Sequence, residues 1–91
     1  MNFTYTNITE AISEKKCVSF VYHQEPQIVK PVMLGVHSVL RSPVFVGVTE
    51  QGTTRMFLLF KTHNLVVLSK THGVTVDQID LTRIKDFEQP V

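Results

Sequence analysis

The chain has 91 residues, with nine Lys and Arg against eight Asp and Glu and a formal net charge of +1. A chain of this length buries only about 60 to 65% of its unfolded surface, which predicts a single domain over residues 1–91 and excludes a large enclosed cleft. The nearly balanced charge excludes a general attraction to polyanions, so any contact with phosphate must come from a local basic patch.

Cys17 is the only cysteine, which excludes an internal disulfide and a zinc site built from cysteines. We expect it to be a small buried apolar residue. The N-terminus has no basic region followed by an apolar stretch, and no segment approaches the roughly 20 apolar residues that cross a bilayer. We therefore expect a cytoplasmic protein without a membrane partner.

A helix is predicted to begin after residues 6 and 7. Thr6 and Asn7 are polar cap candidates, and a helix of about two turns is expected to end near Lys15 and Lys16. Apolar residues follow the cap at helical spacing: Ile8, Ala11 and Ile12.

Two strands are predicted to follow as a hairpin. Residues 17–22 alternate, with Val18, Phe20 and Tyr22 on one face. A turn is expected at residues 23–26 and a second strand from about Gln27 to His37. Pro31 lies inside this second strand and lacks a ladder donor, so it predicts an edge, a bulge or a bend.

Three further apolar runs predict strands at residues 44–48, 55–60 and 65–68, separated by turns at 50–53 and 61–64. Because the first two runs are almost continuously apolar, both of their faces should be covered. The expected fold class is mainly β with a short N-terminal helix, as a small Sm-like barrel of five to six antiparallel strands. The last third is ambiguous: residues 73–76 look extended, and residues 77–88 read as either a capped helix or a strand.

The order of these features resembles that of WYL domains, which are Sm-like small barrels. The resemblance covers residues 7–69, with 70–91 as a C-terminal extension or closing strand, although Leu81–Ile84 also resembles the closing segment of the family. In place of the Trp-Tyr-Leu tripeptide the chain has Pro43-Val44-Phe45, and it is expected to be a free-standing version without a helix-turn-helix domain. The matching stretches are Ile8-x-x-Ala11-Ile12-x-x-Lys15-x-x-Val18-x-Phe20-x-Tyr22, Val29-x-Pro31-x-x-Leu34-Gly35, a strand ending in Gly47, and Arg55-x-Phe57-x-Leu59-x-Lys61.

The resemblance implies a regulatory module that binds a nucleotide, an oligonucleotide or another anion. Carried over by position, Tyr22, Arg55 and Lys61 are the candidate contacts, and Lys30 and Arg41 extend the patch if the fold brings them near. The planar fork of Arg55 suits two phosphate oxygens, whereas a lysine offers a point charge. A tyrosine at the end of an apolar strand face either stacks on a base or closes the core.

The remaining chemistry predicts no enzyme and no metal or cofactor. The four histidines lack the spacing of a zinc site, and His63 and His72 are expected to be solvated turn residues that make association mildly pH-dependent. No nucleophile with a base, paired carboxylates or glycine-rich phosphate loop is present.

The apolar strands offer more surface than a monomer easily hides, which predicts a protein partner or a homodimer. The alternative to the anion sensor is therefore a protein-interaction or oligomerisation module without a small-molecule ligand. A third hypothesis is a small RNA-binding barrel, which would retain RNA in a salt-sensitive manner.

Overall fold

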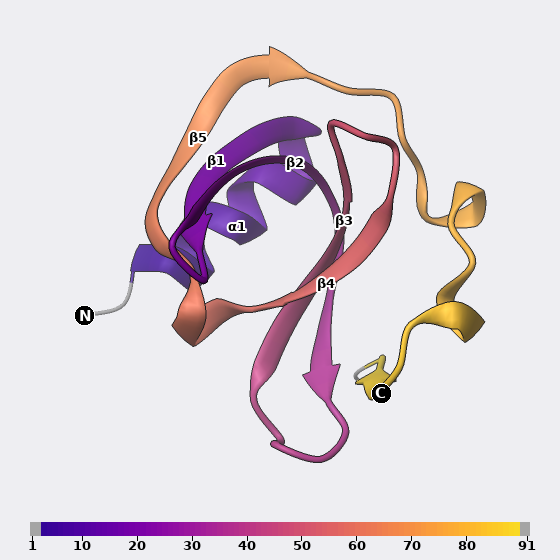
Figure 1. Cartoon of the computed structure of the whole chain (residues 1–91). Coiled ribbons are helices and arrows are strands. Elements are labelled where there is room, and N and C mark those ends of the chain that lie inside the picture. The colour runs from indigo at the N-terminus through magenta and orange to yellow at the C-terminus, as the bar shows by residue number, and fades with distance from the viewer. Residues whose placement is uncertain (1–2, 90–91) are drawn as a thin grey trace.

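The computed structural model describes residues 3–89 and consists of one helix and a six-stranded antiparallel sheet (Figure 1). The predicted fold class, mainly β with an N-terminal helix, is confirmed. No helix among these residues is long and apolar enough to cross a membrane. In chain order the elements are α1 Phe3–Glu14, β1 Lys16–Tyr22, β2 Glu25–His37, β3 Pro43–Thr49, β4 Thr54–Leu58, β5 His63–Thr71 and β6 Phe87–Glu88.

The sheet is strongly curved but does not close into a barrel. Its strand order is β4-β3-β2-β1-β5, with β6 added to the far end of β2, so β4 and β5 form the two ends of the path (Figure 1). The expectation of a closed barrel is wrong in this respect. A 3₁₀ turn at Leu59–Lys61 separates the two end strands, and the backbone N–H and hydroxyl of Thr62 both donate to the Leu59 carbonyl. This turn redirects the chain, and β5 pairs with β1 instead of β4.

The core lies inside the curve of the sheet, with α1 across one side of it (Figure 1). Phe57 is fully buried at its centre, and its ring lies 5.0 Å from that of Phe20, 5.1 Å from Tyr22 and 5.2 Å from Phe45. Cys17 is buried, as predicted. The remaining buried members of the core cluster are Ile8, Ala11, Val18, Val29 and Leu59.

The helix begins earlier than predicted. Thr6 and Asn7 lie inside α1, which runs through Phe3–Glu14, and they do not cap it. The hydroxyl of Thr9 donates to the carbonyl of Tyr5 at 2.8 Å, so a residue type that favours caps finds its hydrogen bond within the helix. The helix end agrees with the prediction, since Lys15 leaves the helix with a φ of 56°.

Pro31 lies at a bulge, one of the three settings predicted for it. It is buried opposite Gly47 of β3, and the register of the β2–β3 pairing shifts between Pro31 and Met33. The bulge bends a 13-residue strand, whose first part pairs with β1 and whose second part pairs with β6. Pro31 therefore helps a single strand contribute to both halves of the curved sheet.

Residues 77–88 form neither the helix nor the long strand that were considered. They contain two 3₁₀ turns, Val76–Gln78 and Leu81–Arg83, and then the two-residue strand β6. The ring of Phe87 covers Gly35 so closely that a Cβ added to this glycine would overlap the ring. This long-range contact fixes the end of the segment, and local sequence patterns do not encode it.

Candidate functional site

The β1–β2 hairpin ends in a strained two-residue turn. Tyr22 pairs with Glu25, which leaves only His23 and Gln24 in the loop, and their φ angles are 50° and 66°. Positive φ at both positions is the pattern of a type I′ turn, for which Asn-Gly is favoured. Neither residue adopts this backbone easily, so the turn holds an imidazole and a carboxamide in place at a conformational cost.

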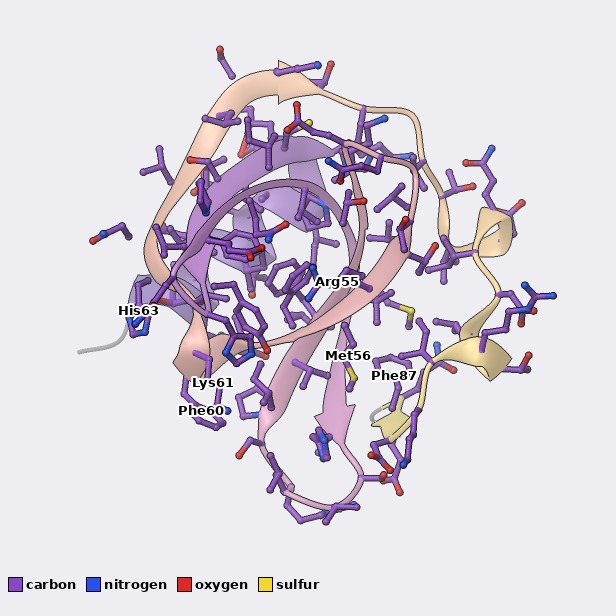
Figure 2. All side chains as sticks on the ribbon, viewed as in Figure 1. Arg55, Met56, Phe60, Lys61, His63 and Phe87 are labelled. Atoms are coloured by element: carbon purple, nitrogen blue, oxygen red, sulfur yellow. The ribbon has the colours of Figure 1, made fainter. Side chains whose placement is uncertain are left out.

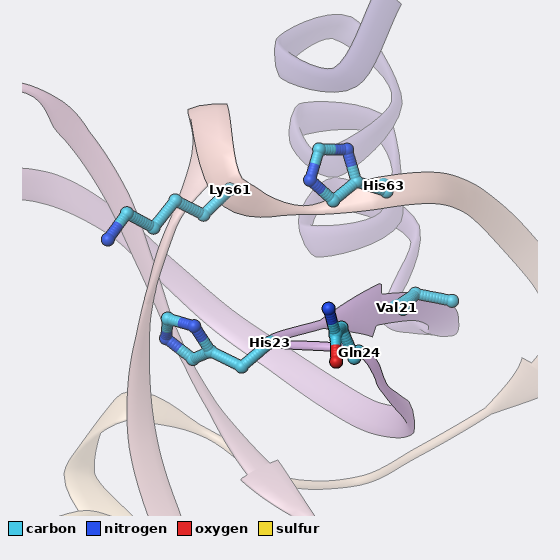
Figure 3. Close-up of a pocket in the computed structure, with 5 residues that line it drawn as sticks. All are labelled: Val21, His23, Gln24, Lys61 and His63. Carbon is cyan, nitrogen blue, oxygen red and sulfur yellow. The ribbon is translucent and has the colours of Figure 1, made fainter.

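These two side chains line one wall of a pocket of about 250 Å³. Lys61 and His63 approach from the opposite wall, where the 3₁₀ turn passes into β5, and Val21 contributes an apolar surface (Figure 3). Val21 and His63 are paired across β1 and β5, which fixes the two walls relative to each other. The pocket thus offers an ammonium, two imidazoles and an amide, and none of its lining residues is acidic.

A row of aromatic rings in edge-to-face contact leads from this pocket to Arg55. The ring of His23 lies 4.4 Å from that of Tyr22, which lies 5.1 Å from Phe57, and the guanidinium carbon of Arg55 lies 4.9 Å from the Phe57 centroid. Figure 2 shows Arg55 within the curve of the sheet and Lys61 beside the turn that follows β4. A cation–π contact uses none of the N–H donors of a guanidinium, so these donors can still bind an anion.

Tyr22 lies beneath the pocket and does not line it. Its side chain is 6% exposed, and its hydroxyl accepts a hydrogen bond from the backbone N–H of Leu58 at 3.1 Å. The arrangement matches the core-closing alternative for this residue more closely than base stacking. Its contribution to the site is to hold the end of β4 against β1 and to support the ring of His23.

The structure does not bring Lys30 and Arg41 to this pocket. Lys30 lies on β2, close enough to His72 to affect its charge state. Arg41 lies in the β2–β3 connection, where its Nη1 is 2.9 Å from Oε2 of Glu88, and this carboxylate neutralises it. Of the predicted patch, Lys61 therefore lines the pocket, and Arg55 is linked to it through the rings of Phe57 and Tyr22. Lys30 and Arg41 do not line it.

Arg55 and Lys61 are free of carboxylates. Four ion pairs occur within residues 3–89, and neither side chain takes part in any of them. The Nζ of Lys61 lies 6.0 Å from the centroid of the Phe60 ring. Within the same described range, no three His, Cys, Asp or Glu side chains converge in a way that could hold a metal ion.

The sequence interpretation missed the contributions of His23, Gln24 and His63 to the pocket. The sequence did contain a signal for them. Two-residue hairpin loops favour Asn-Gly, so His-Gln at this position is unfavourable for the turn and indicates another role for these side chains. His72, which was expected to be a solvated turn residue, is partly buried and makes two hydrogen bonds.

Replacing the strained turn is expected to stabilise the protein. The double substitution His23→Asn and Gln24→Gly should raise the free energy of unfolding by about 1 to 2 kcal/mol, because the new residues adopt positive φ with less strain. Urea unfolding followed by circular dichroism measures this change. Gln51→Asn, at a turn position whose own φ is not positive, is the matched control and should leave stability unchanged. A loss of stability in the double variant would contradict the strained-turn interpretation.

Comparison with known proteins gives a fold relationship. No family model and no curated protein matches the sequence. Among solved structures, the fold is similar to part of proteasome accessory factor B/C (PafBC) of Arthrobacter aurescens, with a TM-score of 0.70 and 18% sequence identity. The match covers 87% of this chain and 13% of that chain, so it corresponds to a small part of a much longer protein. The comparison supports a WYL-like fold for this chain.

Proposed function

We propose that the chain is a non-enzymatic, WYL-like regulatory module that binds a small anion of the nucleotide type. The pocket formed by His23, Gln24, Lys61 and His63 carries this proposal, because an unpaired ammonium faces a strained turn there and no lining residue is acidic. Arg55 would extend the site through the ring row. The rings of Tyr22 and Phe57 support His23 and Arg55 before a ligand arrives, which lowers the entropy cost of binding.

The chemistry of the donors favours a phosphate group. Lys61 provides a mobile point charge, and Arg55 provides a planar fork that binds two oxygens at once. The imidazoles of His23 and His63 donate a hydrogen bond when neutral and add charge when protonated. A pocket of about 250 Å³ has room for a phosphate or diphosphate group but encloses little beyond it.

Titration calorimetry with ADP and with pyrophosphate tests the proposal. Lys61→Gln should weaken the binding of both ligands about tenfold or more, because a hydrogen bond to a charged group contributes about 1.5 to 3 kcal/mol. Arg55→Gln should weaken it as well, and binding to the native protein should fall as salt is added. Lys85→Gln, on the exposed C-terminal segment, is the matched control and should bind as the native protein does.

Equal heats for the native protein and both pocket variants would sink the anion proposal. Tighter binding of ADP than of pyrophosphate would show that the base or sugar adds contacts. Equal affinities would restrict the recognised group to the diphosphate.

A second candidate function rests on the edge of the sheet formed by β5, one of the two strands that end its path. Among the described strands, β5 pairs only with β1, and Val66 on this strand is 54% exposed. Phe60, just before β5, is 55% exposed. Unpaired strand edges beside apolar side chains are sites of strand addition. We infer that the β5 strand of a second copy would pair with this edge about a two-fold axis. A mass near twice 10.4 kDa by light scattering, together with no binding of anions, would favour this alternative.

A further inference from the structure

His72 lies at the hinge between the sheet and the C-terminal segment. Its backbone N–H donates to the carbonyl of Lys15 at 2.9 Å, which fixes the end of β5 to the end of α1. Gly73 follows, is exposed and has open space where a side chain would be. Residues 73–89, named here the C-terminal strap, then cross the surface as far as β6 (Figure 1).

Two hydrogen bonds determine the protonation state of the His72 ring. Its Nδ1 accepts from the backbone N–H of Val74 at 3.1 Å, and an acceptor nitrogen carries no proton. The proton of the neutral ring must therefore be on Nε2, which donates to the carbonyl of Pro31 at 3.1 Å. This carbonyl belongs to the bulge of β2, so the ring joins the start of the strap to the bend in the sheet.

The positive charges around His72 disfavour a second proton on its ring. Lys15 at the end of α1 and Lys30 on β2 both act on the ring with positive charge. On the strap, Asp77 is the nearest acidic residue along the chain, and its carboxylate is hydrogen-bonded to the hydroxyl of Thr75. A proton added at Nδ1 would also face the N–H of Val74, so two donors would oppose each other where one hydrogen bond had been.

The first part of the strap covers a second pocket, of about 170 Å³. Ile12 of α1 and Pro31 and Val32 of β2 line this pocket from the body of the domain. Val74 and Val76 line it from the strap, with the His72 ring at its edge. Apart from the bond between Val74 and the His72 ring, the hydrogen bonds and the ion pair found for residues 74–84 join residues at most three positions apart.

The last part of the strap is attached to the sheet by contacts that do not involve His72. The backbone N–H of Ser38 donates to the carbonyl of Asp86 at 2.8 Å, and β6 pairs with Val36 and His37 of β2. The Phe87 ring covers Gly35, and Glu88 pairs with Arg41. The Nε2 of His37 also lies 4.0 Å from a carboxylate oxygen of Asp86 at this end.

We propose that His72 is a proton-operated latch: its neutral ring holds residues 73–79 over the second pocket, and its protonation releases them while β6 stays attached. The released segment pivots between Gly73 and β6 and exposes the apolar surface of Ile12, Pro31 and Val32. Proton uptake would then couple to the accessibility of an apolar site that lies apart from the anion pocket.

The direction of the pH effect follows from the environment of the ring. Burial, followed by the charges of Lys30 and Lys15 and opposed by the Pro31 hydrogen bond, lowers the pKa of His72 below its ordinary value of 6.5. The unfolded or released segment therefore takes up a proton at higher pH than the closed form does. The closed form should lose stability as the pH falls below about 6.5, with no further loss from this group once the pH is below its lowered pKa.

Two substitutions of His72 distinguish the proposed proton-operated latch from a purely structural role of this residue. In His72→Asn the side-chain oxygen can still accept from the Val74 N–H and does not titrate, so the strap should stay closed from pH 7.5 to pH 5. In His72→Phe the acceptor is lost, so the strap should be open throughout this range. Lys70→Gln, at an exposed position of β5 that lines neither pocket, should behave as the native protein does.

Nuclear magnetic resonance of the full chain as a function of pH provides the measurement. In the native protein, acidification should increase amide hydrogen exchange at Val74 at least tenfold beyond the intrinsic pH effect, while the Gly35 resonances under the Phe87 ring stay unchanged. Binding of the uncharged dye Nile red should increase in parallel. A native strap that stays closed at pH 5, a His72→Asn variant that opens with the native midpoint, or a simultaneous loss of the Phe87 contact would overturn the proposal.

Discussion

Phe57→Ala is expected to lower the free energy of unfolding by about 3 to 5 kcal/mol, the range found when a buried phenylalanine is truncated. The ring of Phe57 is fully buried and lies within 5.2 Å of the rings of Phe20, Tyr22 and Phe45. Its loss would leave a cavity shared by β1, β3 and β4. Since small domains have a total stability of about 5 to 15 kcal/mol, the variant should be close to unfolding in water.

Phe60→Ala is the matched control for this prediction. It removes the same side chain three residues further on, but Phe60 is 55% exposed. Urea unfolding should show a change within about 0.5 kcal/mol for this variant, as is usual for surface substitutions. Comparable losses in the two variants would contradict the placement of Phe57 at the centre of the core.

Gly47→Ala should lower the free energy of unfolding by about 2 to 3 kcal/mol. A Cβ at this position would lie 2.5 Å from a methyl carbon of Val29 and 2.8 Å from the carbonyl oxygen of Lys30. The methyl group could rotate away, whereas the carbonyl belongs to β2 beside the bulge at Pro31 and cannot move without disturbing the sheet. Thermal and urea unfolding both measure this loss.

Gly73→Ala is the control that separates the steric clash at Gly47 from the general effect of replacing a glycine. A Cβ added at Gly73 would have no other atom within 4 Å. This variant should be as stable as the native protein, since nothing opposes the added methyl group. An equally large loss at Gly73 would argue against the close approach of β2 and β3 as the cause.

Local sequence patterns predicted the parts of the fold that short-range physics determines. The alternation of Val18, Phe20 and Tyr22 predicted the buried face of β1, and all three are buried. Pro31 predicted a local irregularity because it lacks a donor, and the bulge is found beside it. These predictions held because strand alternation and proline chemistry act within a few residues.

Features that depend on long-range contacts were not predicted. The gap between β4 and β5 arises because β5 pairs with β1 and not with β4. The form of residues 77–88 depends on the covering of Gly35 by Phe87 and on the hydrogen bond from His72 to Pro31. Each of these contacts joins positions more than 40 residues apart, where propensities carry no information.

The candidate site was only partly predicted, because it too depends on long-range contacts. Lys61 and Arg55 were found by their positions in a family-like stretch, and the structure places Lys61 in the pocket and Arg55 at the end of the ring row. Arg41 was expected to extend the patch if the fold brought it near, but a carboxylate 47 positions away along the chain pairs with it. The partners of a surface charge are set by the tertiary fold, so sequence alone could not distinguish a free cation from a neutralised one.

The central claim is that a small anion binds between the β1–β2 turn and the start of β5. Titration of the isotopically labelled protein with pyrophosphate, followed by nuclear magnetic resonance, tests it most directly. We expect shifts that saturate and that disappear in Lys61→Gln. They should be confined to His23, Gln24, Lys61 and His63, with a smaller effect at Arg55. Shifts centred instead on Lys30 and His72 or on Arg41, or no saturable shifts at all, would contradict it.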